Sequence, residues 1–339
     1  MTEPETTIPK LIENRISKYS GKLLLQRRDG WSWKQITWLD FDRDIKNIAC
    51  FLLDLDFNYG DAALVISANR TESLLSEFAI YHLGGVIIPI DRIKILDRIP
   101  AITRDYDVKF IFVEDAVGLN SILDISENLS NLKRVVIFSG TYGGKDGRVI
   151  QFKSLIKLGR LKRKQIEDDL KTISSSVLAE SLACVFYNSD SEGEGGKKEV
   201  THQNIIEALK GASEQLSYLS EEEQTYSYLP SVSPFEKLIN YLAIYIGFRT
   251  VFAETREDFF ENILEVKPTI IYETQSGLEE ILSEHLGKNR IADPHQLKNE
   301  LGGRANHIIT DSLPRDEIKG LIRTAGINLI ELPEINSLI

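Results

Sequence analysis

One segment of the chain, residues 185–204, combines the residue types that bind phosphate groups, and it reads VFYNSDSEGEGGKKEVTHQN. It follows an apolar stretch and precedes a stretch in which apolar residues recur at helical spacing. Glycines let backbone N–H groups approach an anion, hydroxyl groups donate hydrogen bonds to it, and a lysine neutralises its charge. The segment supplies all three types, at Ser189, Ser191, Gly193, Gly195, Gly196, Lys197 and Lys198. The pattern therefore suggests a phosphate-binding loop between a strand and a helix.

The same segment contains three carboxylates, at Asp190, Glu192 and Glu194. Two like charges ~4 Å apart repel by about 1 to 4 kcal/mol at the dielectric constants of water and a protein surface. Each carboxylate therefore opposes a bound phosphate unless it is paired or faces water. The residue order also differs from G-x-x-x-x-G-K-[ST], which excludes a P-loop of the Walker type. Two interpretations stay open, a phosphate-binding loop and a solvated loop without a ligand, and the residues alone favour the second.

The histidines and cysteines give little sign of catalysis or metal binding. Thr201 is expected to cap the helix that His202 opens, and no carboxylate at a suitable spacing supports a catalytic role for His202. The other histidines lack the spacing of metal ligands. Cys50 and Cys184 lie in apolar runs, where cysteine acts as a small core residue. We therefore predict no catalytic residue and no metal site from the sequence.

Short apolar runs alternate with amphipathic stretches along the whole chain. A β-hairpin is expected at 22–37, turned by Asp29-Gly30. The runs predict strands at 62–66, 86–90, 109–113, 134–138, 182–187, 226–229, 250–253, 268–272, 307–310 and 327–330, with helices between most of them. Such alternation is typical of parallel sheets with helices on both faces. So many strands favour two stacked α/β lobes over one open sheet, with a boundary near 174–180.

The charge of the chain limits its partners. It has 40 Lys and Arg against 51 Asp and Glu among 339 residues, a net charge of −11, which argues against nucleic-acid binding. No apolar run is long enough to span a bilayer, and the polar N-terminus does not resemble a signal peptide, so we expect a cytoplasmic protein. Within 153–164 lies a basic stretch, Lys153, Lys157, Arg160, Lys162, Arg163 and Lys164. We interpret it as a solvated helix, with contact to an anionic membrane surface or an acidic partner as the alternative.

Several segments, in order, resemble the AMP-forming acyl-CoA synthetases of the adenylate-forming superfamily. Residues 185–204 resemble that family's phosphate signature, Y-T-S-G-T-T-G-x-P-K-G-V-x-x-T-H-x-N. GDAALVISANR at 60–70, GGVIIPI at 84–90, LPSVSPFEK at 229–237 and EVKPT at 265–269 are similar to motifs of the long-chain fatty acyl-CoA synthetases. The resemblance covers nearly the whole chain. It implies the two-lobed fold of that family's N-terminal domain, with a first lobe at 38–180, a second at 181–339, and residues 1–37 packing on the second lobe.

The resemblance also implies a site for ATP and magnesium, and here the chain departs from the family pattern. The positions that correspond to the phosphate loop are Tyr187, Ser189, Ser191, Gly193, Gly195, Gly196, Lys197 and Thr201. Asp190 replaces a glycine, Glu192 a threonine and Gly195 the proline, while Lys197 follows the usual lysine position by one residue. TDSLP at 310–314 replaces the family's G-G-A-P-L, and ELPEINS at 331–337 stands where Y-G-x-T-E is expected. We also expect the family's C-terminal catalytic domain to be absent.

These departures lead to three hypotheses about function. The first is a catalytically impaired relative of long-chain fatty-acid–CoA ligases that acts in binding or regulation, with a fatty acyl ligand or a full-length synthetase as its partner. The second is an active ligase that a second chain completes, with ATP and magnesium as cofactors. The third is an interaction module without a ligand.

Overall fold

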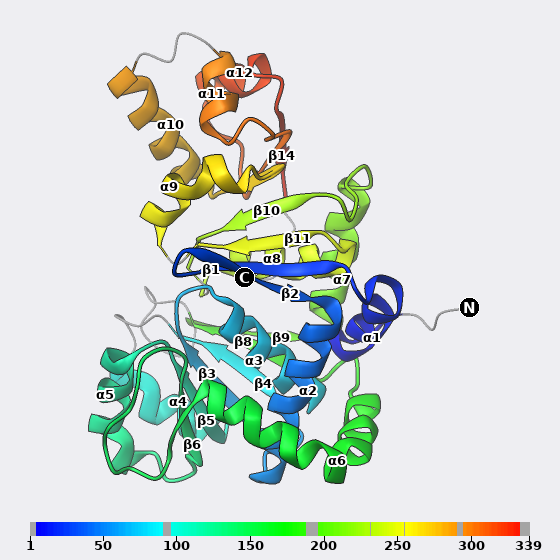
Figure 1. Ribbon diagram of the computed structural model, residues 1–339, viewed down its shortest axis with the longest axis vertical. Helices are drawn as coiled ribbons and strands as arrows, with labels where there is room; N and C mark the ends of the chain where they lie inside the picture. The colour runs from blue at the N-terminus through cyan, green and yellow to red at the C-terminus, as the bar shows by residue number, and fades with distance from the viewer. Residues whose placement is uncertain are drawn as a thin grey trace. The chain divides into compact units, whose positions relative to one another are not determined.

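The structure is a computed structural model that describes residues 5–90, 96–187, 196–230, 232–253, 255–289 and 294–332. The chain forms two compact units (Figure 1). Unit 1 contains residues 1–21 and 38–207, and unit 2 contains residues 22–37 and 208–339. Within the described residues each unit has one seven-stranded sheet. The prediction of two α/β lobes with mostly parallel sheets is confirmed.

The sheet of unit 1 has the order β7-β6-β5-β3-β4-β8-β9. Its strands are β3 (Ala62–Ile66), β4 (Val86–Pro89), β5 (Val108–Val113), β6 (Arg134–Ile137), β7 (Val149–Gln151), β8 (Leu182–Tyr187) and β9 (Lys197–Thr201). Neighbouring strands are parallel except β8 and β9, which form an antiparallel pair at one edge. The helices of the unit are α1 (Ile8–Tyr19), α2 (Trp38–Asp54), α3 (Thr71–His82), α4 (Ile99–Asp105), α5 (Ala116–Ile125), α6 (Phe152–Ser176) and the start of α7 (His202–Gln215), with 3₁₀ turns η1 (Leu96–Arg98) and η2 (Ser126–Asn128).

Both faces of this sheet are buried, as its continuous apolar strands predict. Residues 62–66 of β3 are all buried. Leu64 faces a core that includes Ile102 of α4 and Ile122 of α5. On the opposite face Phe110 stacks with Phe112 and contacts Phe57, which follows α2. The helices therefore cover the sheet from two sides.

The sheet of unit 2 has the order β14-β13-β12-β10-β11-β1-β2. Its strands are β1 (Leu23–Asp29), β2 (Ser32–Thr37), β10 (Gln224–Ser227), β11 (Arg249–Phe252), β12 (Ile270–Tyr272), β13 (His307–Thr310) and β14 (Asn328–Glu331). Among the described strands of this sheet, only the predicted hairpin β1–β2 is antiparallel. The helices are α8 (Pro234–Ile246), α9 (Arg256–Val266), α10 (Gln275–Asn289), α11 (Pro294–Glu300) and α12 (Asp316–Thr324).

Helices also cover two faces of the second sheet. On one face Phe259 of α9, Leu278 of α10 and Ile318 of α12 share a core with Ile308 of β13. On the other face Phe235 of α8 packs edge-on against Tyr272 of β12. Local signals fix the ends of these helices. Ser233 caps α8, Gly247 in the left-handed region ends it, and a Thr255–Asp258 capping box opens α9.

The boundaries of the units differ from those expected at 37 and 180. Residues 8–19 form α1, which contacts α2 and α3 because its buried face presents Ile8, Leu11 and Ile12. Only the hairpin at 23–37 joins the second sheet. Strand β8 belongs to the first sheet, since Cys184 pairs with Ile87 of β4. The division between the units falls inside α7, after Glu207.

Candidate functional site

The hairpin of β8 and β9 carries the two ends of the segment predicted to bind phosphate. Tyr187 ends β8 and pairs with Lys197, the first residue of β9. Gly196 precedes β9 and is buried, and Thr201 ends the strand. Four predicted site residues, Ser189, Ser191, Gly193 and Gly195, lie outside the described residues, as do Asp190, Glu192 and Glu194. Because β8 runs parallel to β4, the segment leaves the sheet at the carboxyl edge of its parallel strands, where open α/β sheets bind ligands.

The ammonium group of Lys197 is occupied by neighbours in unit 1. Its Nζ donates to the hydroxyl oxygen of Tyr106 at 3.0 Å and lies 3.4 Å from Oε1 of Glu199. The Tyr106 hydroxyl in turn donates to the same Glu199 oxygen at 2.6 Å. This hydrogen bond, with the nearby lysine, lowers the pKa of Glu199 below its usual value. Of the two lysines that the sequence offers to a phosphate, Lys197 is therefore already compensated by a carboxylate two residues away on its own strand.

Tyr187, the tyrosine of the predicted loop, packs at the edge of the hydrophobic core of unit 1. Tyr187 and Tyr106 are both partly buried and pack against the apolar cluster of unit 1. Burial raises the pKa of each phenol well above its ordinary value, so both stay neutral at physiological pH. We infer that Tyr187 offers a phosphate a neutral hydroxyl group and no charge.

Thr201 caps helix α7, as predicted. Its hydroxyl oxygen accepts a hydrogen bond from the backbone N–H of Asn204 at 3.1 Å. The Asn204 side-chain oxygen accepts from the Thr201 backbone N–H at 3.0 Å and from its hydroxyl at 2.9 Å. This reciprocal arrangement is a capping box with asparagine at its third position. Both hydrogen-bonding functions of the Thr201 hydroxyl are thereby used at the start of the helix.

His202 lies in the interior of unit 1. It has no exposed surface, its ring packs edge-on against Tyr81 at 5.6 Å, and Nδ1 accepts from the Ile8 backbone N–H at 3.4 Å. Burial, together with the nearby His82, lowers its pKa to about 4. An imidazole enclosed in this way is neutral and cannot reach a substrate, so its role is to join α1 to α7.

Unit 2 has a polar cluster at the carboxyl ends of β10, β12 and β13 that sequence reasoning missed as a site. The Tyr228 hydroxyl donates to Glu273, whose other oxygen accepts from the Thr274 backbone N–H at 2.8 Å. The Gln275 backbone N–H donates to Asp311 at 2.7 Å. Burial raises the pKa of Glu273, and the bonds from Tyr228 and Thr274 oppose that rise. The signal available in the sequence was positional, since Glu273 and Asp311 directly follow predicted strands and Tyr228 lies near the end of another.

Beneath this cluster lies a second carboxyl group, that of Glu236 on α8, which has no exposed surface. One of its oxygens accepts hydrogen bonds from Ser227 at 2.5 Å, Tyr272 at 2.8 Å and Asn240 at 3.0 Å. Burial outweighs these bonds and raises its pKa to about 8. The group therefore joins α8 to β10 and β12 as a largely neutral acid at physiological pH.

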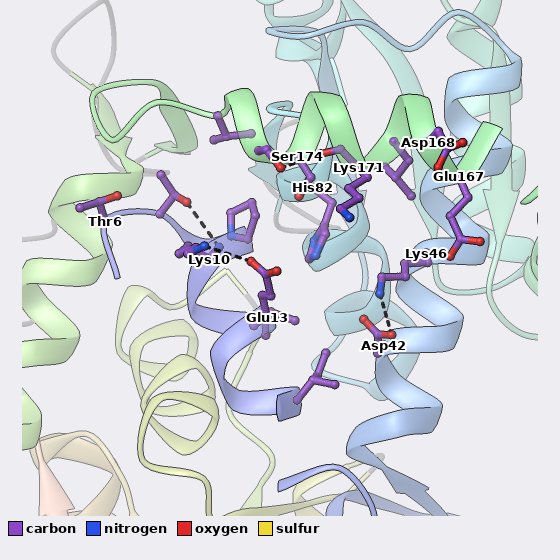
Figure 2. A pocket seen from close by; sticks show the side chains of 17 residues that line it. Thr6, Lys10, Glu13, Asp42, Lys46, His82, Glu167, Asp168, Lys171 and Ser174 are labelled. Carbon is purple, nitrogen blue, oxygen red and sulfur yellow. Dashed lines mark hydrogen bonds and ion pairs between the residues drawn. The ribbon is translucent and has the colours of Figure 1, made fainter. Parts of the chain in front are cut away.

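A cavity of about 980 Å³ lies within unit 1, between α1, α2, α3 and α6 (Figure 2). Two ion pairs lie in its walls, with Lys46 2.8 Å from Asp42 and Lys10 3.3 Å from Glu13. The buried His82 donates from Nδ1 to the Phe78 carbonyl at 2.8 Å, and burial lowers its pKa. No described residue of 185–204 lines this cavity, so it is separate from the predicted phosphate site.

Metal binding finds no support among the described residues, because they contain no group of three or more His, Cys, Asp or Glu side chains that could hold an ion. Among the helices in the part of the chain that the structure describes, none is both long enough and apolar enough to cross a membrane.

The chain is similar in sequence to several long-chain-fatty-acid--CoA ligases. The chain is 20% identical over 276 residues to the long-chain-fatty-acid--CoA ligase FadD15 of Mycobacterium bovis, covering 79% of this chain and 44% of the relative. It is 22% identical over 274 residues to the long-chain-fatty-acid--CoA ligase ACSBG2 of Xenopus laevis, covering 78% of this chain and 36% of the relative. The chain thus spans less than half the length of these two curated relatives.

Solved structures share the fold. The anthranilate CoA ligase AuaEII in complex with anthranoyl-AMP superposes with a TM-score of 0.76 at 18% identity, covering 95% of this chain and 58% of that one. The long-chain-fatty-acid-CoA ligase FadD1 of Archaeoglobus fulgidus gives a TM-score of 0.72 at 14% identity, covering 97% of this chain and 64% of that one. Residues 12–323 match the family model described as AMP-binding enzyme. The chain therefore belongs to the AMP-binding enzyme family and is homologous to long-chain fatty-acid–CoA ligases.

Proposed function

We propose that this chain is a catalytically impaired member of its family that binds a fatty acyl ligand or regulates a full-length synthetase, and does not itself form an acyl adenylate. The observation that carries the proposal is the position of Lys197. Its ammonium group interacts with Tyr106 at 3.0 Å and with Glu199 at 3.4 Å. The fatty acyl class comes from the relatives, whose names include long-chain-fatty-acid--CoA ligases.

The chemistry of adenylation explains why that position matters. Negative charge develops on the phosphate that is transferred, and prearranged donors and cations must stabilise it. Lys197 is compensated by Glu199, and Asp190, Glu192 and Glu194 add negative charge to the same segment. Loss of one electrostatic donor typically lowers the rate by about 10²- to 10³-fold. Several losses in one unit need not multiply, but together they support turnover below detection. These residues do not fit an ATP–magnesium site.

A second candidate is an active ligase completed by another chain. The specific observation in its favour is the naming of its relatives, since two curated relatives, of which the chain covers 44% and 36%, carry ligase names. A partner chain would then have to supply a cation for the transferred phosphate. Pyrophosphate release from fatty acid, ATP and coenzyme A distinguishes the two candidates. We expect no release from the purified chain, with or without lysate of the source organism. Release only with lysate would favour the split ligase, and release from the chain alone would refute impairment.

Calorimetry of ATP binding in the presence of magnesium tests whether Glu199 compensates the charge of Lys197. We expect weak or undetectable binding to the parent chain. Glu199→Gln should tighten binding by about tenfold, because it removes the charge that compensates Lys197. Glu261→Gln is a matched control, since Glu261 is exposed on α9 and its loss changes the net charge equally. Micromolar binding by the parent chain, or equal effects of the two variants, would contradict the proposal.

Ligand binding itself is tested by the thermal stability of the parent chain in the presence of fatty acids, acyl-CoAs and acyl-AMP analogues. A ligand that binds only the folded state raises the unfolding temperature. We expect stabilisation by acyl compounds and none by ATP. If no acyl compound stabilises the chain, the acyl-ligand part of the proposal fails, and the interaction module without a ligand is favoured.

A further inference from the structure

Helix α6 presents a fixed outer face to solvent. Its inner side is buried at Phe152, Leu155, Gly159 and Leu170, and it packs along α2 (Figure 1). At Gly159 the backbones are so close that an added Cβ would lie 1.8 Å from the Asn47 carbonyl oxygen. The helix therefore cannot rotate about its axis, and the residues opposite Gly159 and Leu155 stay exposed.

Four basic residues form a stripe on that outer face, which we call the basic stripe: Lys153, Lys157, Arg160 and Lys164. Their spacings of four, three and four residues place them along one side of a helix. At 1.5 Å per residue the stripe is about 16 Å long. These four side chains make no ion pair with any described residue. By contrast, two neighbouring cations are paired, Lys162 with Asp54 at 2.9 Å and Arg163 with Glu167 at 2.6 Å.

Two exposed leucines accompany the basic stripe. Leu158 is 44% exposed and Leu161 is 64% exposed, and at 100° per residue both lie on the same flank of the stripe. Like charges at a spacing of four residues destabilise a helix, and the exposed surface of the two leucines gains no free energy from burial in the fold. The chain as a whole carries a net charge of −11, so its composition alone does not explain a concentration of unpaired cations.

We propose that the basic stripe and its two leucines bind unit 1 to an anionic lipid bilayer. The cations would lie at the level of the lipid phosphates, and the leucines would enter the boundary between headgroups and acyl chains. A soluble polyanion such as a nucleic acid or an acidic protein segment would satisfy the cations but would leave the leucines exposed. A planar surface that is anionic outside and apolar just beneath matches both parts of this face. The proposal concerns this surface alone and stands whether or not the chain binds a nucleotide.

The test is co-sedimentation of the full chain with vesicles. We expect binding to phosphatidylcholine vesicles that contain about a third phosphatidylserine, weaker binding at higher salt, and none to pure phosphatidylcholine. Lys157→Gln with Arg160→Gln should lower the partition coefficient by about 30-fold, the factor expected for two basic residues at such a surface. Lys210→Gln with Arg304→Gln changes the net charge equally at exposed positions of unit 2 and should leave binding unchanged.

A third variant separates a bilayer from a soluble polyanion. Leu161→Gln keeps the charge and the helix propensity, so it should weaken vesicle binding several-fold without affecting the thermal stability of the chain. All variants replace exposed side chains, and circular dichroism confirms that they are folded. The proposal is overturned if the chain does not bind anionic vesicles, or if the control variant loses as much vesicle binding as the stripe variant. It is also overturned if Leu161→Gln leaves vesicle binding unchanged and the chain binds polyglutamate, a soluble polyanion, as tightly as it binds the vesicles.

Discussion

The imidazole of His202 couples folding to pH. Its folded-state pKa of about 4 lies below the usual value near 6.5, so the folded state holds it neutral. Its contribution to stability is fully present above pH 6.5 and is lost progressively as the pH falls toward 4. At pH 5 the loss should be about 2 kcal/mol.

We therefore predict that the free energy of unfolding in urea falls between pH 7.5 and pH 5 by about 2 kcal/mol more in the parent chain than in His202→Gln. The difference between the two proteins isolates this group from other titrations, including that of His82, whose pKa is also lowered. Equal pH dependence of the parent and the variant would show that His202 does not titrate as proposed.

Glu236 behaves in the opposite sense. Its folded-state pKa is raised to about 8, so its contribution to stability is complete below the ordinary value of 4.5 and is lost as the pH rises through 8. Glu236→Gln keeps an oxygen that can accept from Ser227, Tyr272 and Asn240. We expect this variant to exceed the parent in unfolding free energy by about 3 to 5 kcal/mol at pH 9, and to show no gain at pH 4.5. A gain of the same size at both pH values would exclude titration as the cause.

Among the elements, the contact of α2 with α6 depends on one glycine. A Cβ at Gly159 would lie 1.8 Å from a backbone oxygen of Asn47, which cannot move without shifting α2. We predict that Gly159→Ala destabilises the chain by about 3 kcal/mol, as overpacking does. Gly211→Ala in helix α7 is the matched control, because nothing lies within 4 Å of a Cβ added at Gly211. It should stabilise the chain by about 0.5 to 1 kcal/mol. Thermal denaturation of both variants tests the pair, and similar effects would disprove the close contact.

The predictability of the elements depended on their burial. The all-apolar strands such as β3 were evident because a strand buried on both faces has no polar position. Strand β9, KKEVT, was expected to be loop because only Val200 of its five residues is buried. Helix α1 was not predicted from the sequence, although Thr7 caps it, Pro9 lies in its first turn, and Ile8, Leu11 and Ile12 follow helical spacing. That omission moved the expected boundary of the N-terminal segment to residue 37.

Within the candidate site, only the contacts between residues close in sequence could be predicted. Thr201 as a cap follows from its position before an amphipathic stretch. The proximity of Lys197 to Glu199 would follow from strand periodicity once β9 is known, since alternate residues share a face. The contact with Tyr106 joins positions 91 residues apart, and no local pattern encodes it. The polar ends of β10, β12 and β13 likewise come together only through the order of strands in the sheet.

For the whole molecule, the net charge of −11 makes a prediction about salt. Raising the ionic strength from about 0.01 M to about 0.15 M shortens the screening length from about 30 Å to about 8 Å. A functional phosphate site loses affinity under that change. We expect the weak affinity of the parent chain for ATP with magnesium to stay constant or rise, because screening relieves repulsion. The triple variant Asp190→Asn, Glu192→Gln and Glu194→Gln should show the ordinary decrease, and calorimetry at the two salt concentrations checks both. If the affinity of the parent chain for ATP with magnesium already decreases at higher salt, then attraction by nearby cations outweighs repulsion by the three carboxylates, and the prediction is wrong.

The entry of the hairpin β1–β2 into the second sheet has a consequence for how the protein is made. Leu25 pairs with Thr250, so after the hairpin ends at Thr37 a ribosome must add about 215 residues before its neighbour β11 is complete at Phe252. At about 5 to 20 residues per second, that interval is about 10 to 45 s. During that interval the apolar side chains of the hairpin have no neighbouring strand to pack with, while most of unit 1 is synthesised. The order of synthesis therefore gives unit 1 the first opportunity to fold, and it leaves the nascent hairpin as the segment most in need of protection by a chaperone.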